Sequence, residues 1–282
     1  MMNLDDVAGF FERGSKIWQV NREMVLLLAG GRALLMQLAH PKVAAGVADY
    51  SRFQEDPFAR LRRTMTAMWS IIFDRQPQAR ASLERVELRH KRVRGVVPGG
   101  EPAQSGAPYD AFEQDLLLWV HATLIDSALV AYGRFVAPLA EWEKTAYYND
   151  SKKLAMLFGI RPEVIPDTLK AFGAYMNRAL FGGEVAVGPT ARRLARDVLY
   201  PQSLIFKPGE PLFRFITVGL LPESLRAAYN LQWSARSEKA LGLLAGAIRG
   251  LLPLTPTPVR IVPNARKAEK ARRRPLNEAA HS

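Results

Sequence analysis

Hydrophobic residues recur along most of the chain at intervals of three and four, the spacing that places side chains on one face of an α-helix. Patterns that alternate at every second residue, as a half-buried strand requires, are scarce. The chain is therefore predicted to be dominated by helices that begin and end near prolines and glycines. The predicted helices cover residues 24–39, 58–74, 77–94, 110–136, 151–158, 162–181, 189–199, 210–219 and 222–249.

The order of these segments predicts an all-α class with a single multi-helix globular domain over residues 1–252. A chain of 282 residues with 48% hydrophobic residues is long enough to bury a large core, and no internal repeat divides it. Residues 253–282 are predicted to form a proline-rich linker and a basic tail, mostly disordered from residue 264 or a short basic helix at most. The tail has seven basic and two acidic residues from residue 259 on. A solvated tail is favoured over one that contacts anionic lipid or nucleic acid.

Composition removes several classes of chemistry. The absence of cysteine excludes disulfides, thiolate metal sites and cysteine nucleophiles. Phosphate-binding loops, dinucleotide fingerprints, HExxH zinc motifs and GxSxG elbows are also missing. Transition-metal chemistry therefore depends on carboxylates and on the histidines His40, His90, His121 and His281.

The beginning of the chain bears on its expected location. No basic region precedes an apolar run at the N-terminus, and the longest uninterrupted apolar stretch, residues 24–31, is too short to span a membrane. We therefore expect a cytoplasmic protein, with any membrane association peripheral.

His90 lies on an apolar face of the predicted helix 77–94, next to two arginines, Arg89 and Arg92. The other members of that face are Leu83, Val86, Val93 and Val97. An inward imidazole on a basic helix suits a metal that carries anionic groups beside it. A core histidine satisfied by one hydrogen bond explains the same pattern, and periodicity alone favours it. Glu87 and His90 form an ExxH motif, but its only counterpart, Glu278 and His281, lies in the tail, so a di-iron bundle is not expected.

Other polar residues interrupt apolar faces in the same way. Thr64 lies on the apolar face of helix 58–74, with Arg60 one turn before it and Arg63 beside it. The two arginines either hold carboxylates or face water. His121 lies on the apolar face of helix 110–136 and reads equally as a packed core histidine. His40 precedes Pro41 at a helix end, where a capping role is the simplest interpretation.

Four segments in register resemble a known family. They are residues 31–51 (GRALLMQLAHPKVAAGVADYS), 56–64 (DPFARLRRT), 90–95 (HKRVRG) and 118–123 (LWVHAT). Together they are similar to the MpaB-type oxygenases, which include the bacterial latex-clearing rubber oxygenases, over about residues 17–250. The resemblance implies a globin-like or related helical fold that holds non-covalent haem b. It also implies an oxygenase that uses dioxygen on a hydrophobic or unsaturated small molecule.

The resemblance assigns roles to individual residues. The ligand histidine of the rubber oxygenases is followed by a valine three residues later, a pattern matched by His90 and Val93, so His90 is the expected iron ligand. The family's arginine and threonine, four residues apart, match Arg60 and Thr64 on the cofactor side. Arg89 and Arg92, with Arg60 and Arg63, are placed to pair with the two haem propionates.

The chain departs from the rubber enzymes at two points. Arg63 stands where they have a lysine able to ligate iron, and a guanidinium stays protonated, so Arg63 is expected to shape the distal pocket without ligating. No acidic residue lies between Glu23 and Asp49, where the rubber enzymes have a catalytic glutamate. Rubber cleavage itself is therefore not expected. His40 and His121 are the remaining candidates for a distal polar group.

These observations leave three functions open. The leading one is a haem b-dependent oxygenase of a hydrophobic small molecule. A non-catalytic haem carrier or sensor would share the fold and the cofactor but not the turnover. A basic helical module that binds anionic membrane or nucleic acid rests on charge alone, because no nucleic-acid motif accompanies it. We therefore expect no specific nucleic-acid partner and at most a weak contact of the tail with an anionic membrane.

Overall fold

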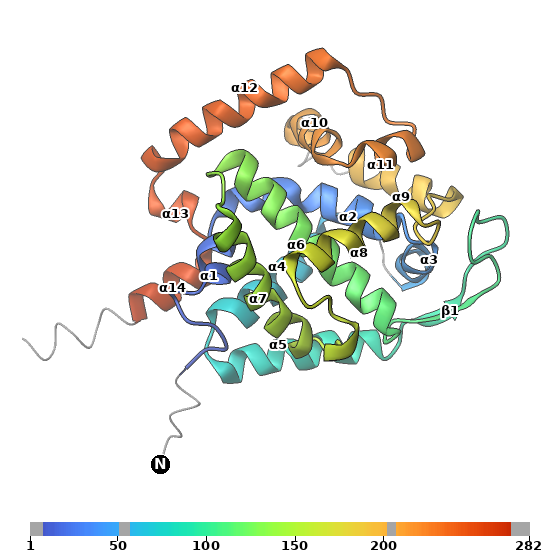
Figure 1. Ribbon diagram of the computed structural model, residues 1–282, viewed down its shortest axis with the longest axis horizontal. Coiled ribbons are helices and arrows are strands. Elements are labelled where there is room, and N and C mark those ends of the chain that lie inside the picture. The colour runs from blue at the N-terminus through green and yellow to red at the C-terminus, as the bar shows by residue number, and fades with distance from the viewer. Residues whose placement is uncertain (1–7, 51–56, 202–206, 272–282) are drawn as a thin grey trace, which may run out of the picture.

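The fold is built almost entirely from helices, as Figure 1 shows for the computed structural model of the chain, which describes residues 8–50, 57–201 and 207–271. The strands in this part of the chain are β1 (Arg94–Val96) and β2 (Pro108–Asp110), which pair antiparallel with Gly95 opposite Tyr109. The predicted all-α single-domain class is confirmed.

The helices follow one another with short connections. The first half of the chain contains α1 (Lys16–Asn21), the 3₁₀ helix η2 (Met24–Ala29), α2 (Gly30–Leu38), α3 (Pro41–Tyr50), α4 (Pro57–Phe73) and α5 (Gln76–His90). The middle contains α6 (Gln114–Phe135), α7 (Glu141–Leu157), η3 (Pro162–Val164), α8 (Leu169–Phe181) and α9 (Pro189–Leu199). The last part contains η4 (Lys207–Gly209), α10 (Glu210–Leu220), α11 (Glu223–Ala228), α12 (Ala235–Leu251), η5 (Leu252–Leu254), α13 (Thr257–Arg260) and α14 (Pro263–Ala271).

α6 is the central helix of the fold. It packs against α1, α2, α7, η2 and α12. Glu113 immediately precedes its first turn, and the Glu113 carboxylate accepts a hydrogen bond from the Asp110 backbone N–H at 2.8 Å in the turn that leads into the helix. By length and composition α6 could also cross a membrane, and half of its apolar window is buried within the fold. The consecutive helices from Met24 to Leu38 and from Pro41 to Tyr50 pass the same test as a pair bent by 107°.

A buried arginine joins three core helices. The Arg32 guanidinium on α2 donates to the Leu220 carbonyl at the end of α10 at 2.7 Å and, on α6, to Ser127 Oγ and Asp126 Oδ2 at 2.6 Å each. Each guanidinium nitrogen thus has a partner, which offsets the cost of burying the charge. The arginine therefore fixes how α2, α6 and α10 pack.

The connection between β1 and β2 is anchored to the rest of the fold by Glu101. This buried carboxylate accepts from the Thr190 backbone N–H at 3.0 Å, in the first turn of α9, where the helix dipole favours a negative charge. Gly188 permits the approach, because a Cβ there would lie 1.5 Å from the carboxylate. The sequence pattern predicts a loop here. The same pattern predicts that the preceding helix continues to residue 94. In the structure α5 ends at His90, and β1 of the hairpin begins at Arg94.

The C-terminal segment differs from the expected linker and tail. Residues 252–254, 257–260 and 263–271 are helical, and Ile261, Val262 and Ala265 are buried. α14 packs on α4, and Asn264 donates to both carboxylate oxygens of Asp74 at 3.0 Å. The folded body therefore continues at least to residue 271, because a few apolar side chains within a basic sequence are enough to dock it. The rest of the expected tail, residues 272–282, lies outside the described residues.

Candidate functional site

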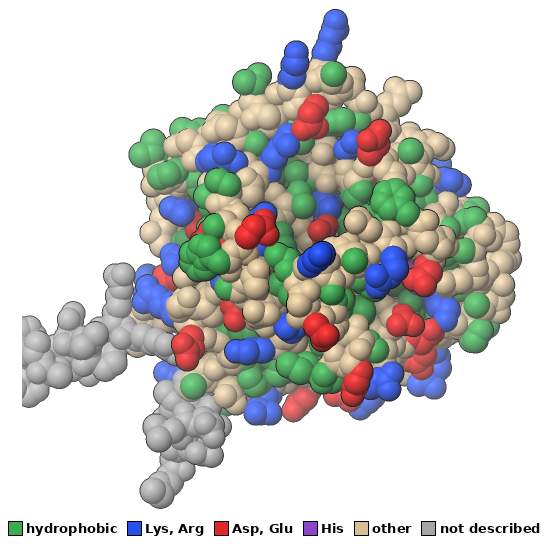
Figure 2. All heavy atoms as spheres, in the orientation of Figure 1, with side chains coloured by type: hydrophobic (Ala, Val, Ile, Leu, Met, Phe, Trp, Pro, Cys, Tyr) green, Lys and Arg blue, Asp and Glu red, His purple; other side chains and the backbone are tan. Residues whose placement is uncertain are grey.

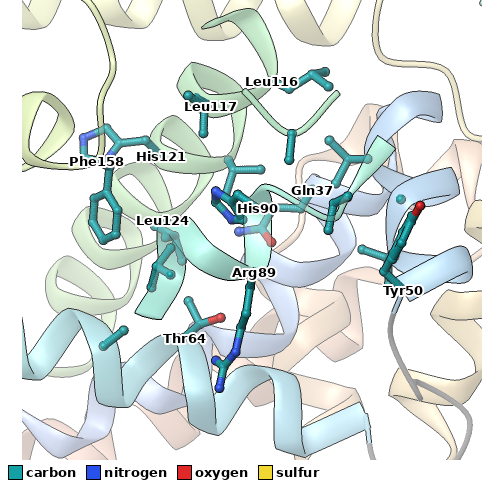
Figure 3. Close-up of a pocket in the computed structure, with 18 of the residues that line it drawn as sticks. Gln37, Tyr50, Thr64, Arg89, His90, Leu116, Leu117, His121, Leu124 and Phe158 are labelled. Carbon is teal, nitrogen blue, oxygen red and sulfur yellow. The ribbon is translucent and has the colours of Figure 1, made fainter. Parts of the chain in front are cut away.

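A cavity of about 680 Å³ lies between α3, α4, α5, α6 and the hairpin (Figure 3). Most of its wall is apolar, with a few polar and cationic side chains among aliphatic ones. Its polar and cationic lining residues are Gln37, Lys42, Tyr50, Arg63, Thr64, Arg89, His90, Arg92, Tyr109 and His121. A concave, mostly apolar space with a few polar groups is the usual form of a small-molecule or cofactor site.

The cavity brings together most of the residues proposed from the sequence. Arg63 and Thr64 come from α4, Arg89 and His90 from the end of α5, Arg92 from the turn that follows, and His121 from α6. All six belong to the cavity lining. Arg60 lies on α4, but its side chain is outside the described residues.

His90 lies in the centre of the cavity view (Figure 3). It is the last residue of α5 and is half-buried, and its ring meets that of Phe112 edge-on with the centroids 6.1 Å apart. The helix ends there because Arg94, Gly95 and Val96 pair with β2. The hairpin therefore sets the position from which this imidazole enters the cavity.

The cavity has a cationic rim. The side chains of Arg63, Arg89 and Arg92 line the cavity and are also exposed to solvent. In Figure 3 Arg89 extends from α5 toward α4, the helix that carries Thr64. Lys42 is bound to Glu113 at 2.5 Å, which neutralises it locally. Three guanidinium groups around an apolar space can hold the carboxylates of an amphipathic ligand while its apolar part is buried.

His121 is buried in the wall of the cavity, beside Phe158 in Figure 3. Burial lowers its pKa to about 4, and a hydrogen bond to the Ser151 backbone opposes this only in part. The imidazole is therefore neutral at pH 7 and offers the cavity a polar group without a charge.

His40 does not belong to the cavity lining. Burial and the nearby Lys42 lower its pKa to about 4, while Glu113 and Asp115 oppose the shift. Its Nδ1 is buried and has no hydrogen-bond partner in the described part of the chain. His40 joins α2 to α3: its N–H donates to the Gln37 carbonyl at 3.2 Å, and its carbonyl accepts from the Ala44 N–H in the first turn of α3 at 2.9 Å. These are backbone bonds, so a capping role for the imidazole stays a prediction, and the place of His40 outside the cavity lining gives no support to a distal role.

Tyr109 was not among the residues proposed from the sequence. It is 3% exposed, lines the cavity from β2, and donates its hydroxyl to Asp49 Oδ2 on α3. Burial, followed by the contact with Asp49, raises the pKa of the phenol, so it stays protonated. The partners are 60 residues apart and belong to no motif, so the sequence held no signal for them.

The donor groups do not form a bare metal site. Within residues 8–50, 57–201 and 207–271, no group of three histidine or carboxylate side chains could hold an ion. A metal bound by His90 would therefore need further donors from a ligand of its own.

Comparison with known proteins gives one family. The family model described as "ER-bound oxygenase mpaB/B'/Rubber oxygenase, catalytic domain" matches residues 17–250. Two similar sequences are uncharacterized proteins of Mycobacterium tuberculosis and Mycobacterium bovis, each 28% identical over 222 residues. These alignments cover 77% of this chain and 84% of each relative. No solved structure gives a significant match.

Proposed function

The chain belongs to the family of mpaB-type and rubber oxygenase catalytic domains, and from this premise we propose that it is a haem b-dependent oxygenase. Its substrate would be a hydrophobic or unsaturated small molecule, and its oxidant dioxygen. The observation that carries the proposal is the cavity, which His90 shares with apolar side chains and with Arg63, Arg89 and Arg92.

The residues present fit this cofactor. The volume of about 680 Å³ lies within the range of roughly 300–1,000 Å³ usual for ligand sites. Aliphatic side chains from α3 and α6 suit a flat apolar ring system. They include Val43, Val47, Leu116 and Leu124. The described residues contain no set of three donors that could hold a bare ion, which suits an iron that brings its own macrocycle.

Several polar groups of the cavity then have a role. His90 would ligate the iron, and Arg89 and Arg92, with Arg60 by similarity, would pair with the propionates. Thr64 would offer its hydroxyl to the cofactor from α4, the helix that also carries Arg60. Haem b, when bound, would supply the iron centre at which dioxygen is activated.

The remaining lining residues would prepare the substrate side. The neutral His121 can accept or donate one hydrogen bond without attracting a counter-ion, and Arg63 stays protonated and cannot ligate. The apolar wall excludes water and favours an apolar substrate. α2 and α3 carry no acidic residue before Asp49, so rubber cleavage with a carboxylate base from that segment is not proposed.

The experiment is aerobic incubation of the haem-loaded protein with a panel of lipids and terpenoids, read by mass spectrometry. We expect at least one member to gain oxygen, and the gain to vanish under nitrogen. If the haem-loaded protein yields no oxygenated product in air with any panel member, the result would favour the carrier or sensor instead.

A further inference from the structure

α12 is apolar on two opposite faces. Its inner face packs on α10 and α6, with Leu241 and Ala245 buried. The outer face carries large apolar side chains that stay exposed in the described part of the chain, and they continue into η5 and α13. These residues are Leu243, Leu251, Leu254 and Val259, between 62% and 79% exposed. We call them, with the exposed Ala247, the outer stripe.

On α12 the outer stripe is preceded by basic residues on the same side of the helix. Arg236, Lys239, Leu243, Ala247 and Leu251 follow one another at steps of three and four, so they share one side of the helix. Figure 2 shows hydrophobic side chains along this upper edge of the molecule, with Lys and Arg side chains at its top. Exposed apolar side chains that gather on one side of the surface mark a place where an apolar partner can bind. The outer stripe therefore points to an apolar partner.

The charge around the stripe identifies the kind of partner. From α12 to α13 the chain has four basic residues, Arg236, Lys239, Arg249 and Arg260, and one acidic residue, Glu238. Arg260 is paired with Glu23. No acidic residue occurs between Glu238 and Glu269. Glu238 already accepts from Arg134 at 2.6 Å and from Trp233 at 3.0 Å, and Glu269 pairs with Arg22 at 3.1 Å. The charge left to face outward is therefore positive.

We propose that the outer stripe docks on an anionic lipid bilayer. Leucine and valine side chains would enter the acyl boundary while basic residues contact acidic headgroups, the combination that holds interfacial helices on membranes. Glycine and alanine between the leucines let the helix lie close to the surface, because they leave no polar side chain to desolvate. The sequence alone indicated only the charge, whereas the apolar part becomes visible once α12 is seen at the surface.

A second copy of the chain fits the stripe less well. A two-fold dimer places the same patch on both sides of the interface. Such a dimer would face Arg236 and Lys239 of each chain with a patch whose carboxylate, Glu238, is already paired with Arg134. The dimer is the alternative outcome of the test.

The test is vesicle flotation of the full chain with phosphatidylcholine vesicles, alone or with about one third phosphatidylglycerol. We expect binding to the anionic vesicles that weakens with salt. The variant Leu243→Gln/Leu251→Gln/Leu254→Gln should bind at least about tenfold more weakly. The matched control is Phe181→Gln on α8, a side chain 72% exposed, which should bind as the wild type does. Arg236→Gln/Lys239→Gln should lose most of the preference for anionic vesicles.

All substituted side chains are exposed, so melting temperatures should remain close to that of the wild type and separate lost binding from lost folding. Wild-type protein that floats with neither vesicle overturns the proposal, as does a triple glutamine variant that binds normally. Light scattering measures the oligomeric state of both proteins. A wild type that is dimeric and a triple glutamine variant that is monomeric would assign the stripe to self-association instead.

Discussion

At the scale of single residues, two buried histidines define the polar character of the fold near the cavity. His40 and His121 are held neutral by burial, which lowers the pKa of each to about 4. Because both imidazoles are neutral near pH 7, they add no positive charge to this region. The net cationic charge of the cavity therefore comes from the arginines at its rim.

This burial predicts how stability depends on pH. Between pH 6.5 and 4 the unfolded chain binds protons at His121 that the folded chain does not, so the free energy of unfolding falls as pH falls through this window. The loss should approach about 3 kcal/mol by pH 4, and His121 should contribute nothing above pH 6.5. Urea denaturation of wild type and His121→Asn checks this, because the variant should show a shallower decline. Parallel declines would contradict the burial of a neutral His121.

The sequence identified those site residues that interrupt an apolar face of one helix. His90, Thr64 and His121 were found in this way, with Arg63, Arg89 and Arg92 as their neighbours, and all line the cavity. Tyr109 and Lys42 were missed because their place in the cavity depends on contacts between distant segments. Their own surroundings in the sequence carry no such signal.

At the scale of elements, a glycine permits a close approach between two helices. Gly31 on α2 faces α10, and a Cβ there would lie 2.1 Å from Thr217 Oγ1 and 2.8 Å from the Phe213 ring. Helical periodicity predicted the two helices but not this approach. It also predicted one helix over 24–39, whereas a 3₁₀ segment, η2, precedes α2. α3 and the polar first half of α7 were missed. The apolar periodicity of α7 is weak, whereas α3 is a short helix made largely of alanine, valine and glycine.

Two glycine-to-alanine substitutions should act in opposite directions. Gly31→Ala should lower the free energy of unfolding by about 1–3 kcal/mol, because the core must move to admit a methyl group. Gly173→Ala on α8 should raise it by about 0.5–1 kcal/mol, because nothing lies within 4 Å and alanine favours the helix. Thermal or urea denaturation measures both. A Gly31→Ala protein as stable as wild type would contradict the packing of α2 on α10.

At the scale of the whole molecule, the chain closes on itself near its beginning. The Arg260 guanidinium donates to both carboxylate oxygens of Glu23, at 2.9 and 3.0 Å, and Glu23 is 5% exposed. The Val262 N–H donates to the Arg22 carbonyl at 2.9 Å, next to this pair. The helices between residues 252 and 271 therefore belong to the domain. The sequence predicted a linker and a tail there because the segment is rich in proline and basic residues.

Breaking this pair from one side should cost more than removing it. Arg260→Gln leaves the buried Glu23 carboxylate without its counter-ion and should lower the free energy of unfolding by about 2 kcal/mol, less than for a fully buried pair. The double variant Glu23→Gln/Arg260→Gln should recover part of that loss, as urea titration of the set will show. A double variant less stable than Arg260→Gln would contradict the assignment.

The central claim, that His90 holds a haem in the cavity, is tested most directly by the absorption spectrum of the purified full-length protein. We predict a Soret band in the protein as isolated or after addition of haem. The band should be weakened or shifted in His90→Ala and retained in His121→Asn, the other histidine that lines the cavity. A protein that stays colourless after reconstitution, or a His90→Ala spectrum identical to that of the wild type, would contradict the account.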